Sequence, residues 1–147
     1  MSDRQNVIKE LDRLVSLSSF DGPIGIEQLE YVQAELSLVY PNEAKEFLIA
    51  YGGGGSFGID LLSLVDPSPY VETHREARAD GLPLEMIILE ESGDGGQYVL
   101  DASDGRDNGV FVWYPGQEDV SEFEPATDDF LSFLDMRLDS VRLYLGS

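Results

Sequence analysis

Four consecutive glycines, Gly52–Gly55, divide the chain into a helical part and a part patterned for strands. Before them, apolar residues recur at intervals of three and four, which is the period of an amphipathic helix. This spacing predicts three helices, over residues 3–15, over Ile26–Leu36 and from Pro41 to Tyr51. Because glycine adopts positive φ without strain, the run is suited to ending the third helix and to a close passage into the next segment.

Short apolar runs separated by turn-forming residues follow the glycines. Runs of this length, bounded by Gly, Pro, Asn or Asp, are typical of strands, and Ser92–Gly96 is typical of a hairpin turn. Two further helices are predicted, one over Tyr70–Ala79 and one that begins at Thr127 with two aspartates in its first turn. The whole chain, 1–147, is expected to form a single α+β domain with an antiparallel sheet. The predicted strands are Ile59–Val65, Met86–Leu89, Tyr98–Leu100 and Val110–Tyr114.

The charge of the chain disfavours several function classes. Its 29 acidic residues against 9 basic ones give a formal net charge of -20. A field this negative repels phosphate backbones and anionic lipid, so we expect a basic partner, no nucleic acid and no membrane surface. The chain has no cysteine and no apolar run near the ~20 residues that span a bilayer, which fits a cytoplasmic protein. Solubility alone, or a salt-rich habitat, would also account for the acidity.

Two glycine patterns are typical of enzymes, and each has a simpler interpretation. Gly53, Gly55 and Gly58 satisfy G-x-G-x-x-G, but a dinucleotide-binding motif needs a strand before it and a helix after it, the reverse of the order here. Ser56 stands in G-x-S-x-G, yet the single histidine, His74, lies in the polar helical pattern, where we expect a solvated side chain. We therefore expect no catalytic residue and no cofactor.

One loop contains a cluster of the oxygen donors that calcium prefers. The alternate-residue spacing of an EF-hand loop is absent, and the same side chains are good turn formers. We therefore expect a turn and no metal site. The cluster consists of Asp101, Ser103, Asp104, Asp107 and Asn108.

The acidic residues are concentrated in one part of the sequence. Glu90–Asp129 contains twelve of them and a single basic residue, Arg106, and most lie in turns beside predicted strands, which predicts one negative face. In the strand from Val110, the side chains of Phe111 and Trp113 share one face, and we expect one of the two faces to be buried. The candidate partner contacts, chosen on charge alone, are Glu90, Glu91, Asp94, Asp104, Asp107, Glu118 and Asp119.

The order of the motifs from residue 24 to residue 136 is similar to that of a known family. The helix over Ile26–Leu36 is followed by Tyr40–Gly54, in which a proline precedes a short helix that ends in glycines. Gly93–Asp101 then supplies a glycine-rich hairpin and a Tyr-x-Leu-Asp strand, Gly109–Val112 the next strand, and Phe130–Leu134 a Phe-x-x-Phe-Leu helix. In this order the chain resembles the SUKH superfamily, which includes yeast regulators of cell-wall assembly and many bacterial immunity proteins.

The resemblance implies a binding protein that is not an enzyme. In bacteria such proteins commonly neutralise a cognate toxin by stoichiometric binding in the cytoplasm, and a basic toxin, for example a nuclease, would suit the acidic surface. The alternative is a regulatory or scaffold interaction domain, as in the eukaryotic relatives. The binding surface of the family varies with the toxin, so the resemblance supplies no contact residues, and the oligomeric state is left open.

Overall fold

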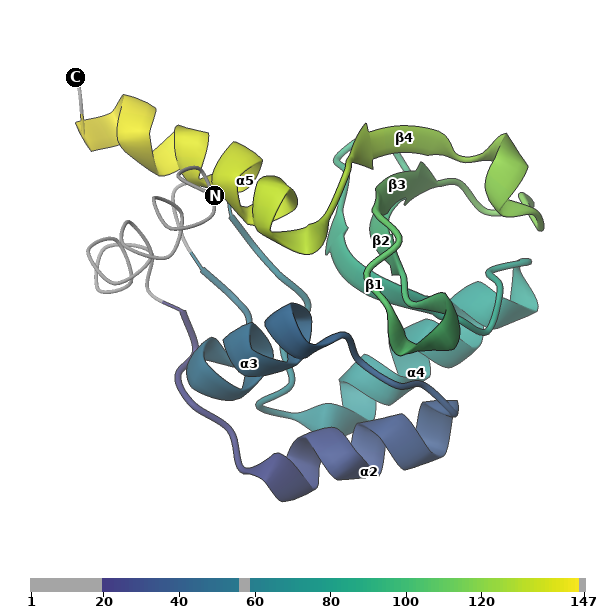
Figure 1. Ribbon diagram of the computed structural model, residues 1–147, viewed down its shortest axis with the longest axis horizontal. Helices are drawn as coiled ribbons and strands as arrows, with labels where there is room; N and C mark the ends of the chain where they lie inside the picture. The colour runs from purple at the N-terminus through teal and green to yellow at the C-terminus, as the bar shows by residue number, and fades with distance from the viewer. Residues whose placement is uncertain (1–19, 56–58, 146–147) are drawn as a thin grey trace.

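The computed structural model describes residues 20–55 and 59–145, which form four helices and one four-stranded sheet (Figure 1). The predicted α+β fold is confirmed, while the helix predicted over residues 3–15 lies outside the described residues. Helix α2 packs against α4, and α3 packs against α5. In chain order the elements are α2 (Ile26–Leu36), α3 (Asn42–Tyr51), α4 (Pro67–Ala79), β1 (Met86–Glu91), β2 (Gln97–Asp101), β3 (Val110–Trp113), β4 (Glu124–Thr127) and α5 (Phe130–Leu145).

The sheet is an antiparallel meander with the strand order β1-β2-β3-β4. Ile88 of β1 pairs with Val99 of β2, and Val99 pairs with Phe111 of β3. Successive connections of a meander lie at opposite ends of the sheet. Residues 92–96 and 114–123 therefore share one end, called here the hairpin end, and residues 102–109 occupy the other, called here the loop end.

Both faces of the sheet are covered, although the sequence predicted burial of one. Ile87 on β1 and Val110 on β3 belong to the main core, which includes apolar residues from all four described helices. Ile88 and Trp113 point to the opposite face and belong to a second cluster, which Ala77 of α4 helps to close. The period-two alternation of each strand thus supplies two separate apolar layers.

The glycine run acts as a turn, as the sequence predicted. Gly52 has φ 74° and donates its N–H to the carbonyl of Leu48 at 2.8 Å, which ends α3. Gly53 passes so close to a neighbouring segment that a Cβ atom there would lie 2.7 Å from the carbonyl oxygen of Leu62. Close backbone contact therefore accounts for these two glycines. Ser56 lies outside the described residues.

The prediction of a strand over residues 59–65 was wrong. Leu61 forms only isolated bridges, one to Gly54 and one to Glu90. A continuous ladder does not form, because the N–H of Asp60 donates to the side-chain carboxylate of Glu90 at 2.7 Å and not to a backbone carbonyl. The segment is therefore attached to the edge of β1 without becoming a fifth strand.

The prediction that the last helix begins at Thr127 was also wrong. Thr127 ends β4, a short edge strand that the sequence analysis missed, and α5 begins at Phe130. The carboxylate of Asp129 accepts a backbone N–H of the first helical turn at 2.7 Å, and that of Asp107 accepts the N–H of Phe130 at 2.8 Å. These two carboxylates satisfy N–H groups that a helix leaves unpaired at its start.

His74 is fully buried, which corrects the expectation of a solvated side chain. Its Nδ1 lies 3.0 Å from the carbonyl oxygen of Tyr70, and its Nε2 accepts the N–H of Ile88 at 2.9 Å. This pattern requires a neutral ring with the proton on Nδ1, because a protonated Nε2 could not accept. Burial disfavours the charged form and lowers the pKa of His74 to about 4.

We expect His74 to make the fold less stable in acid. The unfolded chain takes up the proton near pH 6.5 and the folded chain only near pH 4, so unfolding is favoured as the pH falls through this window and the effect levels off below it. The loss should approach about 3 kcal/mol. Urea unfolding of the wild type and of His74→Gln between pH 7 and pH 4 measures it, since the variant lacks this part of the pH dependence. Parallel curves for the two proteins would contradict the assignment.

Candidate functional site

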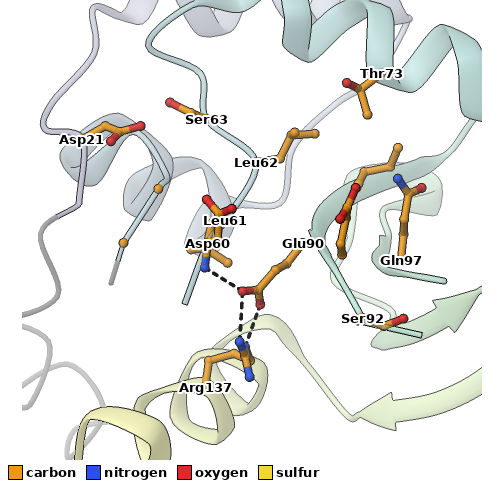
Figure 2. Close-up of a pocket in the computed structure, with 15 residues that line it drawn as sticks. Asp21, Asp60, Leu61, Leu62, Ser63, Thr73, Glu90, Ser92, Gln97 and Arg137 are labelled. Atoms are coloured by element: carbon orange, nitrogen blue, oxygen red, sulfur yellow. Dashed lines mark hydrogen bonds and ion pairs between the residues drawn. The ribbon is translucent and has the colours of Figure 1, made fainter. Parts of the chain in front are cut away.

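A polar cleft of about 720 Å³ opens beside the hairpin end of the sheet (Figure 2). Its described walls come from segments far apart in the sequence: the stretch before α2, residues 54–55 and 60–63, α4, the β1–β2 hairpin and α5. Concave sites with a few convergent polar groups are the usual form of a binding site. The charged and amide side chains that line it are those of Asp21, Asp60, Glu90, Glu91, Gln97 and Arg137.

An ion pair between Glu90 and Arg137 forms one side of the cleft (Figure 2). Arg137 Nε lies 2.6 Å from Glu90 Oε1, and Nη2 lies 3.0 Å from Oε2, so the guanidinium binds the carboxylate with two hydrogen bonds. Glu90 is only 4% exposed and also accepts the N–H of Asp60. Glu90 is among the candidate partner contacts chosen on charge, and in the structure its carboxylate pairs with Arg137 inside the protein.

The other three carboxylates of the cleft are not neutralised in this way. Among the described residues, Asp21, Asp60 and Glu91 make no side-chain ion pair. Asp21 lies directly over Gly54, where a Cβ atom would be 2.5 Å from its Oδ1. Glycine at this position, with φ 73°, therefore leaves the space that the carboxylate occupies.

Gln97 adds an unsatisfied acceptor to the same cleft. Its Oε1 atom is buried and has no hydrogen-bond donor among the described residues. Gln97 lies on β2 opposite Glu91 of β1, and it also borders a second cleft of about 440 Å³ beside Trp113. A buried acceptor without a donor costs free energy.

The single acidic face expected from the sequence is divided in two. Glu91 and Asp94 lie at the hairpin end together with Glu118 and Asp119, whereas Asp104 and Asp107 lie at the loop end. A strand of about five residues, roughly 16 Å, separates the two ends. The candidates were adjacent in the sequence, but alternate connections of a meander carry them to opposite ends.

Several of these acidic side chains accept hydrogen bonds from neighbouring groups of the protein. Hydrogen bonds from the hydroxyls of Ser92 and Tyr114 lower the pKa of Asp94. Asp119 accepts a backbone N–H at the start of a short 3-10 turn at 2.9 Å, which lowers its pKa. Asp107 accepts the first N–H of α5. The exposed members whose side chains make no hydrogen bond or ion pair within the described part of the chain are Glu91, Asp104 and Glu118.

The oxygen-rich loop after β2 is a turn, in agreement with the sequence analysis. Asp101 Oδ1 accepts the N–H of Ser103 at 3.0 Å and its hydroxyl at 2.6 Å, and Asn108 donates to the carbonyl of Ser103 at 2.9 Å. Over residues 20–55 and 59–145, no group of three histidine or acidic side chains is placed to hold a metal ion. In the same residues no helix is both long enough and apolar enough to cross a membrane.

A comparison with family models agrees with the resemblance noted from the motifs, and a second comparison found a bacterial relative. A family model described as SUKH_5, SMI1-KNR4 cell-wall, matches residues 5–138. The "Uncharacterized protein YnaB" of Bacillus subtilis (strain 168) is 24% identical over 119 residues, which cover 80% of this chain and 78% of that protein. The family match includes every charged residue of the cleft.

We expect Arg137→Met to destabilise the fold by about 2–4 kcal/mol, because it leaves the buried carboxylate of Glu90 without its cation. Adding Glu90→Gln should recover part of that loss, since the buried charge is then gone. Arg75→Met is the matched control: it removes the cation of the exposed pair with Glu35, at 2.7 Å, and should cost less than about 1 kcal/mol. Urea unfolding measures all three, and equal losses for the two arginine variants would contradict the interpretation.

Proposed function

The chain belongs to the SMI1-KNR4 (SUKH) family, and from this premise we propose that it is a non-enzymatic immunity protein that binds and neutralises a basic cognate toxin, such as a nuclease, in the bacterial cytoplasm. The family resemblance supports a binding role, and the similarity to a bacterial protein fits this branch of the family. The observation that carries the choice of a basic partner is the acidic hairpin end, where Glu91 and Glu118 are exposed beside a cleft lined by further carboxylates.

The mechanism follows from electrostatics. A net charge of -20 attracts a cationic domain over distances up to about a Debye length, roughly 8–10 Å in physiological salt, and raises the association rate. A nuclease binds its substrate through basic groups that contact phosphates. Carboxylates that pair with those groups would cover the substrate site and exclude nucleic acid, so that inhibition needs no chemical step.

A second candidate function comes from the family description itself, which names cell-wall proteins. A regulatory or scaffold domain would also use an acidic surface to bind a partner. The two candidates differ in their genetic setting, because an immunity protein is encoded beside its toxin. A neighbouring gene for a secreted toxin favours immunity, and its absence favours the scaffold function.

We expect this protein to rescue the growth of cells that express the toxin domain encoded by the adjacent gene, and to co-purify with it as a stoichiometric complex. A second SUKH-family protein of similar net charge serves as the control and should not rescue. Growth curves and size-exclusion chromatography with light scattering measure the two outcomes. Toxicity that persists despite soluble expression of the protein would contradict the proposal.

The exposed acids of the hairpin end should set the association rate. We expect Glu91→Gln with Glu118→Gln to slow toxin association by about threefold at low salt and to flatten its salt dependence. Glu85→Gln with Asp104→Asn removes the same net charge near the loop end, and this matched pair should change the rate less. Stopped-flow kinetics at several salt concentrations distinguishes the pairs. An unchanged rate for the first pair, or equal slowing by both, would exclude the hairpin end as the contact.

A further inference from the structure

We infer that Asn108, in the loop between β2 and β3, is a site of spontaneous deamidation that folding controls. The folded loop holds both reacting groups apart from each other, and the unfolded chain releases them. The reaction replaces the side-chain amide with a carboxylate and leaves a chain that folds less stably. This inference goes beyond the proposed function and does not depend on it.

The residue that follows Asn108 favours the reaction. In deamidation, the backbone nitrogen of the next residue bonds to Cγ of asparagine, the Cγ–Nδ2 bond breaks, and Nδ2 leaves as ammonia with the proton of the attacking nitrogen. Water then opens the cyclic imide at either carbonyl, which gives aspartate or isoaspartate. Glycine leaves the attacking nitrogen accessible, because it has no Cβ. Of the three asparagines in the sequence, only Asn108 precedes a glycine; Asn6 precedes Val7, and Asn42 precedes Glu43.

The side-chain amide that would be attacked is anchored in the folded protein. Asn108 Nδ2 donates to the carbonyl of Ser103 at 2.9 Å and to that of Arg106 at 3.3 Å. These bonds tie the amide to the turn at residues 103–106, although the residue itself is exposed. Nδ2 can leave as ammonia only after both bonds are broken.

The attacking nitrogen, that of Gly109, is held as well. Its N–H donates to Asp107 Oδ1 at 3.1 Å, while Oδ2 of the same carboxylate accepts the N–H of Phe130 at 2.8 Å. Attack requires the nitrogen to lose its proton, and a hydrogen bond to a carboxylate favours the protonated form. The negative charge of Asp107 also opposes a second negative charge on the neighbouring nitrogen. The folded loop therefore suppresses the nucleophile.

The backbone between the two reacting groups continues the pairing of β2 with β3. The N–H of Asn108 donates to the carbonyl of Asp101 at 3.0 Å, and the N–H of Asp101 donates to the carbonyl of Gly109 at 3.0 Å. The next residue, Val110, is fully buried. Rotating the peptide unit between residues 108 and 109 to close the ring would strain both bonds. Ring closure therefore requires this end of the sheet to open, by local or global unfolding.

The product fits the folded loop poorly. A carboxylate only accepts hydrogen bonds, so aspartate at position 108 would direct its oxygens at the carbonyls of Ser103 and Arg106. It would also add negative charge to a loop that already contains Asp104 and Asp107. Isoaspartate adds a methylene group to the backbone before Gly109 and so disturbs the pairing with Asp101. Deamidation in the unfolded chain therefore disfavours the return to the folded state.

Peptide mapping of the wild-type protein by mass spectrometry tests the control by folding. The protein is incubated in buffer and in guanidinium chloride at the same mildly alkaline pH, and the loss of unmodified Asn108 is followed in both. We expect the loss to be faster in denaturant by about tenfold or more, because the folded chain reacts only while it is open. Asn42 is the internal control and should react far more slowly than Asn108 in denaturant. Equal rates at Asn108 in the two solutions, a faster rate in buffer, or equal rates at Asn42 and Asn108 in denaturant would overturn the inference.

A matched pair of substitutions tests the effect of the product. Asn108→Asp should lower the midpoint of urea unfolding. Asn42→Asp makes the same chemical change at an exposed residue in the first turn of α3, where negative charge is favourable, and should leave the midpoint unchanged or raise it. A midpoint for Asn108→Asp equal to that of the wild type, or equal lowering by both substitutions, would overturn the inference. If Asn108→Asp does not fold, the incubation of the wild type, which needs no variant, decides.

Discussion

The buried carboxylate of Glu90 connects three parts of the molecule that the sequence keeps far apart. It lies on β1, binds Arg137 of α5 through two hydrogen bonds, and accepts the backbone N–H of Asp60. A carboxylate that is 4% exposed is costly to desolvate, and bidentate pairing with a hydrogen-bonded cation offsets that cost. The cleft has its shape because the edge of β1, the 59–65 segment and α5 all meet at this side chain.

A β-bulge gives Glu90 its direction. The pairing of β1 with β2 shifts between Ile88 and Glu90, so that Glu90 lies opposite Tyr98. Strict alternation would place Glu90 on the same face as Ile88, in the second apolar cluster. Tyr98 instead faces α5, where its ring lies 5.1 Å from that of Phe133. The extra residue therefore turns Glu90 toward the helix that carries its cation, which is how bulges commonly re-aim a side chain.

Apolar periodicity was enough to predict α2, α3 and the first three strands, because these elements bury regular faces. It failed where a polar side chain takes a core position. In α4, Tyr70, Val71 and Ala77 follow a helical period only if His74 is counted with them, and the sequence analysis assigned His74 to solvent. β4 was missed because its Glu-Pro-Ala-Thr sequence has little strand character, which an edge strand tolerates.

The site was harder to predict than the fold, since it depends on contacts between distant segments. Local acid density selected Glu91, which lines the cleft, as a candidate partner contact, whereas Asp21 and Asp60 stand far from the acidic stretch in sequence and were not among the candidates. One signal was present: Arg137 follows Phe130 by seven residues and so shares the buried stripe of α5, where an arginine needs an acidic partner.

The acidic residues of this chain fall into two physical groups. Glu90, Asp107, Asp119 and Asp129 use their oxygens to satisfy internal N–H groups, so their charge is part of the fold. The open carboxylates of the hairpin end and the cleft satisfy no such groups, and their mutual repulsion opposes the compact state. A basic partner would relieve that repulsion as it binds, so complex formation and stability of the fold are thermodynamically linked. The uncompensated charge thus opposes folding of the free protein, and a basic partner that neutralised it would stabilise the fold on binding.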